Sequence, residues 1–205
     1  MLIALNILLV VTASSQEVQK PDLRTMQMAM YMAGSIAEDP MAPGGFGSSD
    51  NFPMKLKRNE LPKTGVRGHL TKTKQGLSLT LANGGKTEAW FYAGDGRILA
   101  WLEAKDAKGK WKPIEYLPWY TCGNSYHRVQ LPPQHGWTWN VTIPNGAYKT
   151  SVRWHYKFGE EDMVSNEIQA SIPVERFSLN AKLGNTSEIR TDWGTPTLMP
   201  KNFGR

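Results

Sequence analysis

The strongest constraint on the fold comes from two alternating segments on either side of a tight turn. In residues 137–143, Trp, Val and Ile occupy the odd-numbered positions and polar residues the even-numbered ones. In residues 148–158, aromatic residues and valine occupy most even-numbered positions, and Lys, Ser, Arg and His the odd-numbered ones. A period of two residues is that of a β-strand with one buried face. Because Pro144-Asn145-Gly146 is a turn sequence, we predict two strands here, the second with a wet face that exposes His155.

Shorter runs extend this pattern over residues 66–172. Glycine-containing turns separate candidate strands at 77–81, 89–92, 98–103, 111–116 and 164–172. Seven or eight short strands at roughly 8–12-residue spacing, with no convincing helix among them, are typical of a sandwich or barrel. The sequence therefore predicts an all-β, antiparallel fold. Because the strands supply few aliphatic residues, we expect these tryptophans in the core: Trp90, Trp101, Trp137, Trp139 and Trp154.

The first thirteen residues predict export. They form an apolar run that is shorter than the roughly 20 residues of a membrane-spanning helix and ends in Val11-Thr12-Ala13. Small residues after a short apolar run are typical of a signal-peptide cleavage site. We therefore predict a signal peptide at residues 1–13 and a secreted, periplasmic or cell-envelope location. A buried N-terminal strand or helix is the alternative.

Residues 14–66 differ in composition from the strand region and are predicted to be an N-terminal extension. A Pro/Gly/Ser-rich linker covers residues 40–49. Before it, Leu23, Met26 and Met30 fall near helical spacing, which predicts a short helix, although the methionines of residues 26–32 also alternate as in a strand. We place the β-sandwich domain at residues 67–173 and a C-terminal tail at residues 174–205.

The charge pattern and the cysteine content indicate which partners the protein can bind and what can stabilise its fold. The net charge is +6, but the basic residues are interspersed and match no nucleic-acid-binding motif, so we expect no nucleic-acid partner. Cys122 is the only cysteine and cannot form an internal disulfide, so the fold must depend on its core.

Three segments resemble the immunoglobulin-like and fibronectin-type sandwich domains of exported bacterial proteins. They are the hairpin at residues 101–111, the turn and strand at residues 144–152, and Ser165-Asn166-Glu167 at the start of the last strand. The resemblance implies an immunoglobulin-like β-sandwich of the disulfide-free branch, with Trp101 or Trp90 at mid-sandwich and Tyr148 at a tyrosine corner. An architecture of this kind implies almost nothing about function.

No constellation of residues predicts catalysis or metal binding. Cys122 with His127 or His135 is the one imaginable thiol site, and a buried inert thiol is far commoner. The histidines lack ligand spacing for zinc. Methionines 26–32 could present thioethers to Cu(I), but such runs more often fill cores. We therefore predict no catalytic residues, no metal and no cofactor.

An aromatic cluster around a proline-containing segment is the best candidate binding site. It comprises Trp111, Tyr116, Trp119 and Tyr120. Flat exposed rings stack on sugars, whereas core and edge packing is the alternative role.

The functional prediction is an exported, non-enzymatic structural or protein-interaction module. Its partner would be an extracytoplasmic protein or polysaccharide, bound at strand edges or at the loops of residues 132–135 and 159–162. Carbohydrate binding through the aromatic cluster is the alternative, and a thiol-dependent enzyme is a weaker one. We expect no transmembrane segment after removal of the signal peptide.

Overall fold

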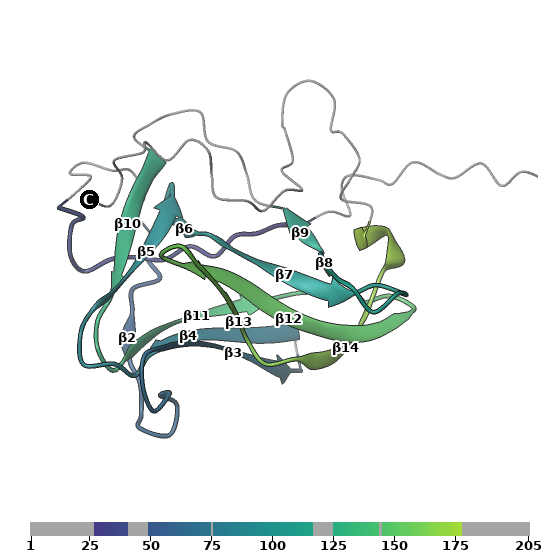
Figure 1. Cartoon of the computed structure of the whole chain (residues 1–205), viewed down its shortest axis with the longest axis horizontal. Coiled ribbons are helices and arrows are strands. Elements are labelled where there is room, and N and C mark those ends of the chain that lie inside the picture. The colour runs from purple at the N-terminus through teal and green to yellow at the C-terminus, as the bar shows by residue number, and fades with distance from the viewer. Residues whose placement is uncertain (1–26, 41–48, 75, 117–124, 144, 178–205) are drawn as a thin grey trace, which may run out of the picture.

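The computed structural model describes residues 27–40, 49–74, 76–116, 125–143 and 145–177. Within these ranges the protein is mainly antiparallel β-structure with curled sheets, which confirms the all-β prediction (Figure 1). The predicted signal peptide lies outside the described residues.

One sheet has the order β2 (Met54–Lys55), β11 (His135–Val141), β4 (Gly76–Asn83) and β3 (Val66–Thr73). Its inner face consists of alternate residues of the two central strands, as the period of two predicted. These are Leu77, Leu79, Leu81, Trp137, Trp139 and Val141, and all are buried.

The second sheet lies over the first in Figure 1. It has the order β13 (Glu161–Val164), β12 (Tyr148–Phe158), β7 (Ala100–Lys105) and β8 (Trp111–Pro113). β14 (Ile168–Ile172) continues the line of β13 along the same side of β12. β12 directs Val152, Trp154 and Tyr156 into the core. The alternation read from residues 148–158 is therefore confirmed.

Smaller elements complete the structure. A third sheet has the order β10 (Tyr126–Leu131), β5 (Ala89–Gly94) and β6 (Arg97–Ile98). β1 (Gln27–Met28) pairs in parallel with β9 (Glu115–Tyr116). A 3-10 helix, η3 (Val174–Phe177), begins the stretch predicted as a C-terminal tail, and its Arg176 is buried.

The predicted core tryptophans are confirmed with one exception. Trp101, Trp137, Trp139 and Trp154 are buried. Trp90 is only half-buried, and the Arg128 guanidinium lies 5.2 Å from its ring centroid. Trp101 is buried against the ring of His155, with ring centroids 4.1 Å apart.

The short helix predicted from Leu23, Met26 and Met30 is wrong over its described part, because residues 29–34 run extended across the core. We call these residues the crossing segment. Ala33 donates its N–H to Gly96, and Tyr31 accepts from the N–H of Ile98. The odd-numbered residues Ala29, Tyr31 and Ala33 are buried, so the period is two, as the alternating methionines suggested. The extended form wins because its backbone pairs with β6 while one face fills the space between the sheets.

Two strand edges are capped by side chains. On β10, the N–H groups of Gln130 and Arg128 donate to Ser35 Oγ at 2.9 Å and Asp39 Oδ2 at 2.8 Å. On β3, the Asn166 amide pairs with both the N–H and the C=O of Leu70, and Gly68 donates to the Tyr156 hydroxyl. Such caps block an edge from pairing with another chain.

Candidate functional site

The edge of β11 that faces β2 is not capped like the edges of β10 and β3. β2 pairs with only the first residues of β11. β2 pairs with His135 and Gly136, and Leu56 extends this pairing by donating its N–H to the Gln134 carbonyl. Backbone groups alternate between the two edges of a strand. Thr138 and Asn140 therefore direct their N–H and C=O groups to the same side as Gly136, beyond the end of β2. Among the described residues, none pairs with these groups.

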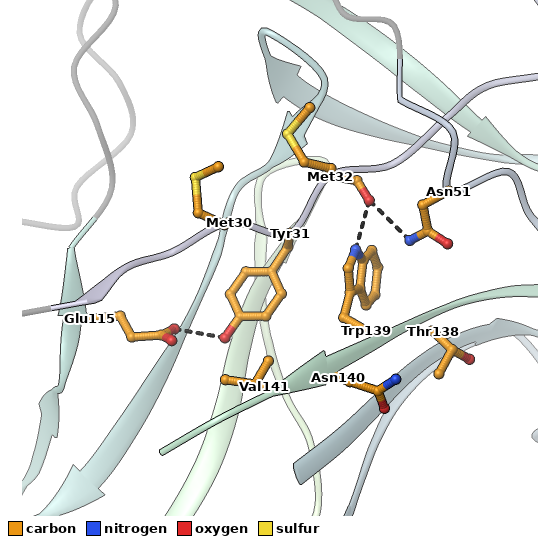
Figure 2. Close-up of a pocket in the computed structure, with 9 residues that line it drawn as sticks. All are labelled: Met30, Tyr31, Met32, Asn51, Glu115, Thr138, Trp139, Asn140 and Val141. Carbon is orange, nitrogen blue, oxygen red and sulfur yellow. Dashed lines mark hydrogen bonds between the residues drawn. The ribbon is translucent and has the colours of Figure 1, made fainter. Parts of the chain in front are cut away.

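A pocket of about 280 Å³ opens between this edge and the crossing segment. Figure 2 shows the rings of Tyr31 and Trp139 between the crossing segment and β11, with the side chains of Met30 and Met32 pointing away from β11. Its lining residues are Met30, Tyr31, Met32, Asn51, Glu115, Thr138, Trp139, Asn140 and Val141. A free strand edge and a pocket thus lie side by side.

Hydrogen bonds from side chains fix the crossing segment at this pocket. The Met32 carbonyl accepts from Trp139 Nε1 at 2.6 Å and from Asn51 Nδ2 at 3.0 Å (Figure 2). One residue pair further along, Trp137 Nε1 donates to the Gly34 carbonyl at 2.9 Å. The crossing segment, which forms one wall of the pocket, is therefore bonded to β11, which forms the other wall. The site is thus preorganised.

Glu115 is the one ionisable carboxyl among the lining residues, and it is 1% exposed. Its Oε2 accepts two hydrogen bonds, from the Tyr31 hydroxyl at 2.6 Å and from the Leu102 N–H at 2.8 Å. Its Oε1 receives no hydrogen bond from the described residues. A buried carboxyl with one unused oxygen at a pocket is a polar group that a ligand can satisfy.

Burial controls the protonation of this site. Loss of solvation raises the pKa of Glu115 to about 7, although hydrogen bonds from Tyr31 and Leu102 and the nearby Arg176 charge act to lower it. Burial and the adjacent Glu115 together raise the pKa of the Tyr31 hydroxyl well above its ordinary value. Arg176 donates to the Ile114 carbonyl at 3.3 Å. Strongly perturbed groups beside a pocket are typical of functional sites.

The sequence-predicted aromatic cluster is described only in part. Trp119 and Tyr120 lie outside the described residues, as does the side chain of Tyr116. Trp111 is half-buried on β8, where the Arg153 guanidinium lies 4.1 Å from its ring centroid and the Lys105 ammonium 4.7 Å. Two cations therefore lie over the Trp111 ring, which the sequence analysis proposed as a stacking surface for sugars.

The thiol site cannot be assembled from the described residues, because Cys122 lies outside them. Of its two candidate partners, His127 is buried with Nδ1 against the Ser125 carbonyl, and burial lowers its pKa. His135 contacts the Pro133 carbonyl through Nδ1 at 2.7 Å. Within the described ranges no group of three or more His, Cys, Asp or Glu residues is arranged to hold a metal ion.

The prediction that His155 is exposed is wrong. Its side chain is only 14% exposed, stacked on Trp101, with Nδ1 at 3.0 Å from Glu103 Oε1 and Nε2 at 2.8 Å from Asp162 Oδ1. Burial alone would raise the pKa of Glu103, but hydrogen bonds from His155 and Arg153 lower it. The outer face of β12 is polar, as the alternation predicted, but Trp101 and Asp162 of neighbouring strands cover the His155 ring.

Comparison with protein-family models, with curated proteins and with solved structures gives no match. Within the described ranges, the structure contains no helix with the length and apolar character needed to cross a bilayer.

Sequence reasoning missed Glu115 as a site residue. The available signal was a lone acid between two hydrophobic residues, Ile114 and Tyr116, in a strand of two residues. Its partner Tyr31 lies 84 residues earlier in the chain, so no local spacing relates them.

Proposed function

We propose that this protein is an exported, non-enzymatic protein-interaction module with an immunoglobulin-like β-sandwich, and that it binds an extended segment of an extracytoplasmic partner. The partner segment adds a strand to the free edge of β11 at Thr138 and Asn140. In this mode backbone hydrogen bonds provide affinity, and pockets for alternate side chains provide specificity.

The observation that carries this proposal is the contrast between strand edges. Side chains cap the edges of β10 and β3. The edge of β11 at Thr138 and Asn140 has no such cap among the described residues, and a pocket adjoins it. Exposed strand edges are normally blocked because they recruit other chains. An edge left open beside a preorganised pocket is therefore best explained by a partner strand.

Asn140→Pro is expected to weaken binding of an extended peptide at least tenfold, because proline removes an N–H that the partner strand needs. The probes are acetylated, amidated pentapeptides Thr-Val-Xaa-Val-Thr whose central residue is Lys, Arg, norleucine, Ser or Glu. Binding is followed by Trp fluorescence, since Trp139 lines the pocket and is 8% exposed.

Asn140→Ala is the matched control, because it removes the same side chain but keeps the N–H. It should bind like the unmodified protein, and circular dichroism should show both variants folded. If none of the peptides binds the unmodified protein, or if Asn140→Pro and Asn140→Ala bind alike, strand addition at this edge is wrong. Saturable binding of soluble polysaccharides without peptide binding would favour the carbohydrate alternative.

A further inference from the structure

We propose that the pocket beside β11 is a specificity pocket for a lysine side chain of the partner strand, whose ammonium group donates to Glu115 Oε1. This inference rests on the proposed function and names the side chain that the site selects. It makes Glu115 the residue that determines specificity.

The dimensions and walls of the pocket fit a single long side chain. A volume of about 280 Å³ lies just below the range of about 300–1,000 Å³ that is usual for small-molecule sites. Met30, Trp139 and Val141 supply apolar walls, and Glu115 supplies the one carboxylate. Lysine combines an apolar stem with a charged end, so its stem can contact these walls while its ammonium reaches the acid.

The hydrogen bonds at Glu115 favour lysine over arginine. Tyr31 and Leu102 already donate to Oε2, which leaves Oε1 as the oxygen without a hydrogen bond from the described residues. Arginine binds carboxylates best through two parallel hydrogen bonds, one to each oxygen. An ammonium group needs only one acceptor oxygen and directs its three donors freely. A site with one unused oxygen therefore suits lysine better.

Charge gives a reason for a cation rather than a neutral donor. Glu115 is buried, and a buried carboxylate without an ion pair is costly to maintain. Arg176 is near enough to lower the pKa of Glu115, and its guanidinium also donates to the Ile114 carbonyl. A lysine ammonium at Oε1 would add a counter-charge in direct contact with the carboxylate.

The same arrangement links binding to pH. Burial raises the pKa of Glu115 to about 7, and among the described residues the ionisable groups that interact with it are Tyr31 and Arg176. Neither group changes charge between pH 6 and pH 8, because burial raises the pKa of the Tyr31 hydroxyl further and an arginine guanidinium stays protonated in proteins. The ionised fraction of a carboxyl with this pKa falls from about 90% at pH 8 to about 10% at pH 6. Binding of an ammonium group requires the ionised form and should weaken about tenfold over this range.

The test measures binding of the five pentapeptides to the unmodified protein at pH 8 and pH 6, and to E115Q. We expect the Lys peptide to bind at least tenfold more tightly than the Arg and norleucine peptides at pH 8. Its affinity should fall about tenfold at pH 6, while the norleucine peptide changes little. In E115Q the preference for Lys and its pH dependence should both disappear, with the norleucine affinity retained.

The outcomes separate this inference from the proposed function. Equal binding of all five peptides, or tighter binding of the Arg peptide, would overturn the lysine inference and leave strand addition standing. No binding of any peptide would overturn both. The pH series uses the unmodified protein, so the inference is tested even if E115Q does not fold.

Discussion

Trp154→Ala is expected to lower the free energy of unfolding by about 3–5 kcal/mol, the range for removing a fully buried large aromatic side chain. Trp154 lies where both sheets and the crossing segment meet. Its ring centroid is 5.0 Å from that of Tyr156, 5.3 Å from that of Tyr31 and 5.5 Å from that of Trp139. Alanine leaves a cavity that these rigid rings cannot fill. Urea denaturation followed by circular dichroism measures the loss.

Trp90→Ala is the matched control, because Trp90 is half-buried and its ring contacts Arg128. Loss of that cation–π contact costs about 1 kcal/mol. Similar, small losses in both variants would contradict the placement of Trp154 in the core between the two sheets.

Glu115→Gln is expected to remove a loss of stability that the unmodified protein suffers as pH rises. The free energy of unfolding of the variant minus that of the unmodified protein should be about 3 kcal/mol greater at pH 8 than at pH 4. The pKa of Glu115 is about 7 in the folded protein, against an ordinary value of 4.5. Between these values the folded state holds a proton that the unfolded state has lost, so stability falls as pH rises. Glutamine keeps an oxygen acceptor for Tyr31 and Leu102 and does not titrate.

Denaturation of both proteins at pH 4, 6 and 8 gives this difference. Because other carboxyl groups titrate alike in both, comparing the two isolates Glu115. Parallel pH profiles would show that Glu115 is ionised at an ordinary pKa and has no special role. A buried acid that weakens the fold at neutral pH is easier to understand if it has a ligand.

Strand patterns predicted the sheets well where one face is buried and the other wet. The alternation in residues 137–143 and 148–158 placed Trp137, Trp139 and Trp154 in the core, as found. A shift of one residue would move each of these rings to solvent, so the pattern admits one register only.

The crossing segment shows where such patterns fail. Its methionines drew attention as the apolar set, yet the buried residues are the intervening Ala29, Tyr31 and Ala33, and Met30 is 50% exposed. Hydrophobicity alone did not identify the core face, because the Tyr31 ring packs between the sheets with its hydroxyl bonded to Glu115, and the two alanines share that face. The backbone bonds to Gly96 and Ile98 decided the conformation, and they join residues far apart in sequence.

The candidate site could not be predicted from the sequence, because it too depends on contacts between residues far apart in the chain. Glu115, Tyr31 and the edge of β11 come from three distant segments, and the site depends on where β2 ends. Nothing in residues 135–141 marks Thr138 and Asn140 as uncovered. His155 was misjudged likewise, since its partners Trp101 and Asp162 lie on other strands.

Amide hydrogen exchange at β11 tests the central claim most directly. In the free protein, the amides of Thr138 and Asn140 should exchange quickly, whereas those of Trp137 and Trp139, which face β4, should be protected. Saturation with the Lys pentapeptide should slow exchange at Thr138 and Asn140 and leave Trp137 and Trp139 unchanged. If Thr138 and Asn140 are already protected in the free protein, another segment of the chain covers this edge, and it is not the partner site that we propose.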